Sequence, residues 1–357
     1  MKRLRLLFSH ELRLFRVSVP LHMVVFLQPS ILFWLITLVF VHPTLEMNLA
    51  DSGTPQAERL AAAMQEIGVR DGDVVTVPYI ELNLIDAQTW DGISQLVAVE
   101  TRGSGLAAVQ YYGYIDSNLV KNYRNRLTAA ALRLWNAELG SHAITLIEEP
   151  WLVREAPFTL FFGMAMLPLA AFMTAALLAC LLITQDYETG TILEYRLSPV
   201  SAGLVLGMRL LRLVLSSWLS AGLLLLAVGL RTGCWPTSIL QVGLALLPII
   251  LTAACLGLII GMLFRRFLPS FALSFIVTLM GWILGSAFGL AGGFGGWYAV
   301  LGRLVPNTYT VELLFPLFYN GIQVANQGFT IIVLICFTLV MSGLMGRLYH
   351  QSVRGQA

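Results

Sequence analysis

Residues 185–199, which read QDYETGTILEYRLSP, place a compact acidic cluster between two long apolar runs. The cluster contains Asp186, Glu188 and Glu194 and a single base, Arg196. Carboxylates in such a place can form charge-assisted hydrogen bonds with Arg or Lys side chains of another protein, and a few such pairs fix the register of a docking interface. The alternative is a solvated polar loop whose charges only mark the end of a membrane span.

No other residues in the chain combine into a recognisable catalytic set. The remaining carboxylates are scattered, and no Ser or Cys nucleophile stands at a telling spacing from a histidine. The phosphate-binding pattern GxxxxGK[ST] is absent, so this chain is not expected to bind ATP in that manner. We therefore expect a non-enzymatic protein that carries neither a metal nor a cofactor of its own.

The composition is that of an integral membrane protein. Hydrophobic residues make up 57% of the chain and charged residues 12%, whereas soluble domains carry about 25% charged residues. A span needs roughly 20 apolar residues. Six runs qualify: residues 19–41, 158–183, 204–230, 238–263, 270–291 and 329–347. The net charge of +2 and the lack of a long basic run give no reason to expect nucleic acid as a partner.

The acidic residues are concentrated in one polar segment. Of the 20 acidic residues, five lie outside residues 46–155, and the other 15 lie inside that segment. The sequence therefore predicts one water-exposed domain, residues 42–157, inserted into an apolar membrane body. Helix-forming and β-rich runs alternate within it, which predicts helices at 57–68 and 118–139 and strands at 73–80, 95–100, 107–115 and 142–148.

The basic residues predict the orientation. With the N-terminus inside, the cytoplasmic flanks of the six runs hold twelve Lys and Arg residues, and the opposite short loops hold only Arg231 and Arg303. Inner loops of membrane proteins carry the excess of Lys and Arg. Both termini are therefore expected in the cytoplasm, and residues 42–157 outside.

Residues 1–18 predict an amphipathic helix that lies along the inner membrane surface. Such a helix keeps its apolar face in lipid and its Arg side chains at the phosphates. An ordinary basic flank is the alternative. The residues of the two faces are Phe8, Leu12 and Phe15 against Arg5, Arg13 and Arg16.

The predicted spans two to six carry no charged residue or histidine at their apolar centres. Ion-coupled transporters usually bury such groups in the bilayer. If the protein transports a solute, the energy is therefore expected to come from another subunit.

The acidic cluster resembles the cytoplasmic loop between the second and third spans of ABC-2 type permeases, the membrane subunits of a class of ATP-binding-cassette exporters. The family pattern is similar to E-x-G-T-L-E-x-L-L-x-S/T-P. The matching residues are Glu188, Gly190, Thr191, Ser198 and Pro199, and Glu194 stands one place after the second Glu of the pattern. If residues 186–196 form a short helix under the membrane, the resemblance implies that its carboxylates project into the cytosol and dock an ATPase.

A second stretch, residues 296–321, is similar to the external segment before the last span of the same family. The matching residues are Trp297, Leu301, Leu304, Pro306, Thr308, Tyr309, Glu312 and Gly321. Before it, Gly281, Gly285 and Gly289 recur every four residues, which predicts a tight helix–helix seam. That seam lies either within one subunit or between two copies. We expect the three glycines to serve helix packing, and Trp297, Pro306, Tyr309 and Glu312 to belong to an external gate.

Together these features predict a mainly α, polytopic membrane protein with six transmembrane helices and a small α/β extracytoplasmic domain between spans one and two. The expected segments are residues 1–18 as the interfacial helix, 19–41 as span one, 42–157 as the external domain, 158–347 as spans two to six and 348–357 as a cytoplasmic tail. Residues 184–202 are expected to form the coupling loop, and residues 291–328 an external, Gly-rich and re-entrant segment.

The resemblance implies the permease subunit of an exporter in the bacterial cytoplasmic membrane, in the subgroup with a large extracytoplasmic domain after the first span. It implies a cytoplasmic ATPase subunit that binds ATP and magnesium, a second permease subunit, identical or closely related, and surrounding membrane lipid. The apolar spans favour a hydrophobic or amphipathic substrate such as a lipid, a lipid-linked molecule or a drug. The alternative is a membrane sensor or assembly factor that uses the external domain as a ligand-binding module.

Overall fold

The structure is a computed structural model of residues 1–357. It describes residues 19–40, 45–50, 55–66, 68–71, 74–78, 80–85, 95–102, 105–112, 117–139, 158–192, 194, 201–285, 296–319 and 326–354. The chain divides into two compact units. We call them the helical unit, Met1–Phe40 with Ala156–Ala357, and the inserted unit, Val41–Glu155.

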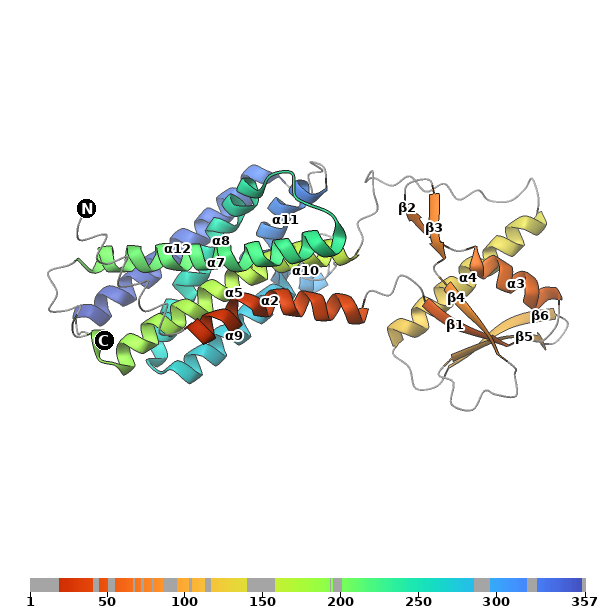
Figure 1. The fold of residues 1–357 in the computed structure, drawn as a ribbon, viewed down its shortest axis with the longest axis horizontal. Coiled ribbons are helices and arrows are strands. Elements are labelled where there is room, and N and C mark those ends of the chain that lie inside the picture. Colours follow the sequence, from red (N-terminus) through yellow and green to blue (C-terminus); the bar gives the residue numbers. More distant parts are fainter. Residues whose placement is uncertain are drawn as a thin grey trace. The chain divides into compact units, whose positions relative to one another are not determined.

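Long α-helices form the helical unit (Figure 1). Their bounds are α2 (Val19–Phe40), α5 (Phe158–Glu188), α7 (Ala202–Thr232), α8 (Ile239–Phe264), α9 (Phe267–Leu284), α10 (Gly296–Arg303), α11 (Pro306–Phe318) and α12 (Gln327–Arg354). In the described part of the chain, five of them, α5, α7, α8, α9 and α12, are long and apolar enough to cross a membrane, and α2 has a shorter apolar stretch. The prediction of a mainly helical chain with several apolar helices of spanning length is confirmed.

The α5 helix occupies the centre of the helical unit. It packs against α2, α7, α8 and α9, and its apolar stretch is buried along its whole length. A helix that is apolar on every face is stable where neighbouring helices or lipid cover those faces, and around α5 the cover is provided by other helices. Small residues let α8 approach closely, because Gly257 lies against the backbone of Ala176 on α5.

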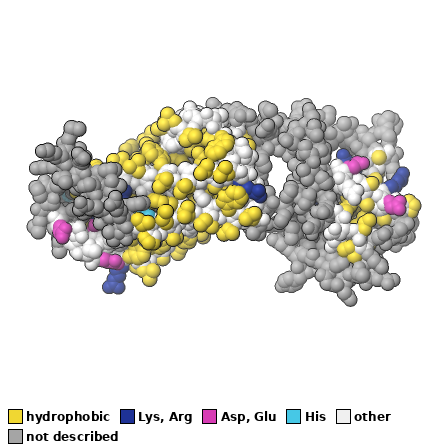
Figure 2. Space-filling view, viewed as in Figure 1, with side chains coloured by type: hydrophobic (Ala, Val, Ile, Leu, Met, Phe, Trp, Pro, Cys, Tyr) yellow, Lys and Arg dark blue, Asp and Glu magenta, His cyan; other side chains and the backbone are white. Residues whose placement is uncertain are grey.

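The α9 and α12 helices have large exposed surfaces. Of their most apolar stretches, only 22% in α9 and 17% in α12 is buried. Side chains such as Ile332, Leu339 and Val340 on α12 are exposed, and apolar side chains cover much of the visible surface of the helical unit in Figure 2. Such a surface suits lipid tails or another apolar chain better than it suits water.

A four-stranded sheet lies at the centre of the inserted unit, with the strand order β4–β1–β5–β6. The elements are β1 (Leu45–Ala50), α3 (Pro55–Gln65), β2 (Gly68–Asp71), β3 (Val74–Pro78), β4 (Ile80–Ile85), β5 (Gln95–Arg102), β6 (Gly105–Tyr112) and α4 (Ser117–Leu139). The β1 strand is parallel to β4 and β5, and β6 is antiparallel to β5. Leu49, Met64, Val97 and Ala130 form a buried core between the sheet and the two helices.

The sequence predicted most of these elements. Both predicted helices are present as α3 and α4, and the strands predicted at 73–80, 95–100 and 107–115 are present as β3, β5 and β6. The strands β1, β2 and β4 were not predicted. Six-residue runs such as LEMNLA in β1 mix apolar and polar residues without strong β-propensity, and their pairing in the sheet stabilises them. The strand predicted at 142–148 lies outside the described residues.

Candidate functional site

The acidic cluster begins inside α5 and not in a separate short helix. Asp186 and Glu188 occupy the last turn of α5, and the helix ends where Thr189 N–H donates to the Gln185 carbonyl at 2.9 Å. Gly190 follows with φ of 76°, a left-handed conformation that glycine adopts at little cost and that commonly ends a helix. The prediction of one short helix over residues 186–196 is therefore wrong at its start.

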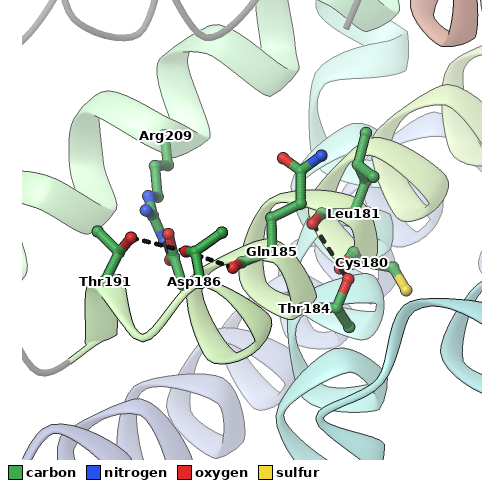
Figure 3. A network of polar contacts seen from close by, with 8 residues as sticks. Cys180, Leu181, Thr184, Gln185, Asp186, Thr191 and Arg209 are labelled. Atoms are coloured by element: carbon green, nitrogen blue, oxygen red, sulfur yellow. Dashed lines mark hydrogen bonds and ion pairs between the residues drawn. The ribbon is translucent and has the colours of Figure 1, made fainter. Parts of the chain in front are cut away.

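Asp186 is buried, and it forms an ion pair with Arg209 of α7. Figure 3 shows Arg209 reaching from α7 to the Asp186 carboxylate at the end of α5. The prediction that Asp186 projects into solvent is therefore wrong. A carboxylate at a helix C-terminus is disfavoured by the helix dipole, and the guanidinium group of Arg209 offsets that cost.

A second polar contact lies one helical turn further along α7. The Arg212 guanidinium and the His22 ring nitrogen Nε2 on α2 are 3.1 Å apart, and both side chains are buried. Because Arg can only donate, His22 accepts through Nε2 and carries its proton on Nδ1. The spacing of Arg209 and Arg212 puts both on one face of α7, so this face ties α7 to both α5 and α2.

Glu188 is exposed, and its Oε1 accepts a hydrogen bond of 2.8 Å from the backbone N–H of Phe267. Phe267 is the first residue of α9, so Glu188 caps the N-terminus of that helix across a tertiary contact. The neighbouring Arg265 places its guanidinium 5.5 Å from the ring centre of Tyr187. The end of α5 is thus attached to the connection between α8 and α9.

The rest of the acidic cluster is partly described. Thr189 donates to the Gln185 carbonyl at 2.7 Å, and its hydroxyl lies 2.7 Å from that of Thr191. Glu194 is helical and exposed. Ser198 and Pro199 lie outside the described residues, as do Arg5, Phe8, Leu12, Arg13, Phe15 and Arg16 of the predicted interfacial helix.

Sequence reasoning missed the structural roles of His22, Arg209 and Arg212. The signal was present, because Arg209 and Arg212 are the only charged residues inside the predicted span 204–230. Both belong to the twelve basic residues that the sequence places at the cytoplasmic flanks. A charged residue within an apolar helix that finds a partner on a neighbouring helix is a site to look for.

The second family-like stretch forms two helices, α10 and α11, placed between α9 and α12 in the chain. Pro306 begins α11 at its first position, where the missing N–H costs no hydrogen bond. Thr308 donates to the Gly302 carbonyl at 2.5 Å, and the Tyr309 hydroxyl donates to the Arg303 carbonyl at 2.8 Å. These two bonds hold α10 against the first turn of α11.

Glu312 lies in the middle of α11, and Thr330 of α12 donates to its Oε2 at 3.4 Å. Burial raises the pKa of the Glu312 carboxyl, and the hydrogen bond from Thr330 and the charge of Arg303 lower it in part. Burial also raises the pKa of the nearby Tyr309 hydroxyl. The Trp297 side chain and Gly289 lie outside the described residues.

The glycine seam predicted in α9 is a contact within this chain at two of its positions. A Cβ on Gly285 would stand 2.6 Å from Cβ of Asn307 on α11, and one on Gly281 would lie 3.8 Å from the Asn307 amide nitrogen. Gly285 therefore lets the N-terminus of α11 approach the end of α9. The sequence left open whether the seam lies inside one subunit or between two copies. For these two glycines it lies inside the subunit.

In the part of the chain that the structure describes, no group of three or more His, Cys, Asp or Glu side chains is placed to hold a metal ion. Comparison of the sequence with protein-family models found no match. Comparison with curated proteins found no match either. The functional argument therefore depends on the geometry of the α5 end and on the motifs of the sequence.

Proposed function

We propose that this chain is the permease subunit of an ATP-binding-cassette exporter, and that the exposed carboxylates at the end of α5 and just after it dock its ATPase. The observation that carries the proposal is the difference in burial among the carboxylates of the acidic cluster. Asp186 is buried and paired with Arg209, so it anchors the segment, whereas Glu188 and Glu194 are exposed. A firmly anchored segment with exposed charge is suited to transmit force from a docked protein to the helices.

The contacts of the anchored segment support this role. Through Asp186, Glu188 and Tyr187 the end of α5 is connected to α7, to α9 and to the α8–α9 connection. A displacement of this segment would reach three other elements of the helical unit without passing through a flexible linker. Two-state rearrangements of packed helices need contacts of this kind.

The proposal includes a topology and partners. In it α2 is span one and brings the number of spans to six, both termini and the acidic cluster face the cytoplasm, and the inserted unit is extracytoplasmic. The chain pairs with a second permease subunit and with ATPase subunits that bind ATP and magnesium. The substrate is hydrophobic or amphipathic, because the apolar stretch of α5, at the centre of the unit, contains no charged side chain.

Substitutions at Glu188 and Glu194 test the docking surface. Glu188→Gln retains an oxygen that accepts from the Phe267 N–H and removes the charge. Glu188→Arg removes both, and Glu194→Arg reverses an exposed charge. We expect all three to reduce recovery of a nucleotide-binding partner from native membranes and ATP-driven transport by about tenfold or more, the effect of losing an interfacial charge pair.

The matched control is Glu58→Arg, a charge reversal of the same size at an exposed position in α3. It should leave the recovery of the ATPase unchanged. If Glu188→Gln and Glu194→Arg both retain the ATPase and full transport, then Glu188 serves only to cap α9 and the docking surface is wrong. Thermal unfolding separates the two roles, because only Glu188→Arg removes the cap.

One observation, the separate fold of the inserted unit, supports the alternative function of a membrane sensor or assembly factor. It has its own sheet and its own buried core, as a ligand-binding module would. In that case no ATPase is recovered with the chain under any conditions, and deletion of the inserted unit abolishes the function. Recovery of an ATPase that depends on Glu194 decides between the two.

A further inference from the structure

The contact between α9 and α11 buries a polar group that has no partner. The Asn307 side chain is 0% exposed, and neither its amide nitrogen nor its carbonyl oxygen has a hydrogen-bond partner in the structure as described. A buried polar group left unsatisfied carries its full desolvation cost. That cost acts against the closed α9–α11 contact and vanishes when water reaches Asn307.

The Asn307 backbone side of the contact is tightly packed. On one side, Cβ of Asn307 lies against Gly285 so closely that an added methyl group would meet it at 2.6 Å. The helix start at Val305 also has no side-chain cap. The contact between the end of α9 and the start of α11 is therefore tight but contains no hydrogen bond from Asn307.

The hydrogen bonds of the two helices show which parts of α9 and α11 are attached to their neighbours. The α9 helix is fastened to α5 at both ends, by the Glu188 cap and by Trp282, whose Nε1 donates to the Ala165 carbonyl at 2.8 Å. The α11 helix is fastened at its second half, where Leu317 accepts from the Thr237 N–H at 2.8 Å. Its first turn makes side-chain hydrogen bonds only to α10 among the described residues, and the Tyr309 ring lies 6.4 Å from that of Phe337 on α12.

From this arrangement we infer that the α9–α11 contact is a joint that opens, and that α10 and the first turn of α11 move together away from α9. Opening exposes Asn307 to water and separates it from Gly281 and Gly285. The desolvation cost of the unsatisfied amide raises the free energy of the closed state relative to the open state. This inference needs no ATPase and holds for the isolated chain whether or not the proposed function is correct.

Accessibility of a thiol in the joint tests the inference. Gly281→Cys places a thiol where an added Cβ meets only ordinary contacts, at 3.7 and 3.8 Å, in a full chain whose four native cysteines are changed to Ala. In lipid nanodiscs, the rate of reaction with a water-soluble maleimide reports opening. In that background Asn307→Leu, which removes the amide at similar size, should slow labelling about tenfold or more. Gly285→Ala, which wedges the joint, should speed labelling.

Thr174→Val is the matched control, because the Thr174 hydroxyl is also buried and without a partner but lies in α5. It should leave the labelling rate of the joint unchanged. Labelling of Asn307→Leu at the rate of its parent or faster would overturn the inference, as would a parent and a Gly285→Ala variant that both fail to label. Because the assay contains no nucleotide and no partner, its failure is distinct from a failure of ATPase docking.

Discussion

At the scale of single residues, burial separates charged side chains of the same type into different roles. Asp186 and Glu188 are two residues apart, but the first is buried against Arg209 and the second is exposed. Removing one partner of a buried pair costs about 3–5 kcal/mol, since it leaves an unpaired buried charge. Asp186, Arg209 and Arg212 are therefore structural residues that hold α5, α7 and α2 together, and are poor choices for testing docking.

Glu312 provides a prediction for pH. Because burial raises the pKa of its carboxyl above the ordinary value of 4.5, the folded state disfavours the charged form. The free energy of unfolding therefore falls as the pH rises through 4.5 and the folded pKa, and the full destabilisation is present above both. Glu312→Gln keeps an oxygen for Thr330 and should raise the Tm by about 1–2 °C at neutral pH.

Thermal unfolding at several pH values checks this expectation. The difference between Glu312→Gln and the parent should disappear below pH 4.5, where the parent carboxyl is also neutral. Glu58→Gln, at an exposed site in α3, serves as a control, because the carboxylate that it removes is not buried. A Glu312→Gln variant less stable than the parent at neutral pH would show that the charge of Glu312 stabilises the contact between α11 and α12.

At the scale of elements, the closest approach at any glycine of the described residues is between α5 and α8. A Cβ on Gly257 would stand 2.1 Å from the Ala176 carbonyl oxygen, and one on Gly261 would stand 2.2 Å from the Ile183 side chain. The first obstacle is backbone and cannot move aside, whereas the second is the end of a side chain. Gly257 therefore sets the distance between the two helices, in the manner of small residues at membrane helix contacts.

Gly257→Ala is expected to destabilise the helical unit by about 1–3 kcal/mol, because it must push α8 away from α5 along much of their contact. The measurement is the Tm of the detergent-solubilised chain. Gly222→Ala in α7 is the matched control, since an added Cβ there meets nothing within 4 Å, and alanine favours helix. Equal stability of the two variants would contradict the assigned packing.

The sequence predicted the elements better than their ends. The run 158–183 became α5, but the helix continues through the polar residues up to Glu188, because helical hydrogen bonding does not stop where apolarity stops. The two-residue contact at Val97–Leu49 that joins β5 to β1 could not be predicted, since strand pairing depends on tertiary packing. The helices α10 and α11 lay in a segment predicted only as re-entrant.

Within the candidate site, the sequence indicated which residues matter and not what they contact. Residue types pointed to Glu188, but its hydrogen bond to Phe267 joins segments far apart in the chain. Spacing pointed to Gly285, but Asn307, which lies against it, was one unmarked residue inside a matched motif. Which residues meet across two helices depends on the rotation and register of each helix, and the residue pattern of a single sequence does not reveal these.

At the scale of the whole molecule, the inserted unit interrupts the helical unit between α2 and α5. The α2 helix has contacts of its own that hold it in place: Phe33 is fully buried, and Ser220 of α7 donates to the Phe26 carbonyl at 3.3 Å. Near the other end, Arg231 lies over the Trp34 ring at 5.7 Å. We therefore expect these contacts to hold α2 in place without the chain connection through the inserted unit.

Removal of the inserted unit tests this independence. Phe33 lies close to Gly163, and Phe40 and Phe158 each lie between one and two turns beyond that contact toward the same end of the two helices. A Gly/Ser linker of about eight residues in place of residues 42–155 is long enough to join them. We expect the shortened chain to remain folded in detergent, with a Tm within a few degrees of that of the full chain.

Phe33→Ala in the shortened chain separates packing from connection. If packing holds α2, loss of this buried ring should cost about 3–5 kcal/mol and lower the Tm well below that of the shortened parent. If the inserted unit holds α2 instead, the shortened chain is already destabilised and Phe33→Ala adds little. The first result would establish the helical unit as a self-sufficient membrane body to which the inserted unit is attached.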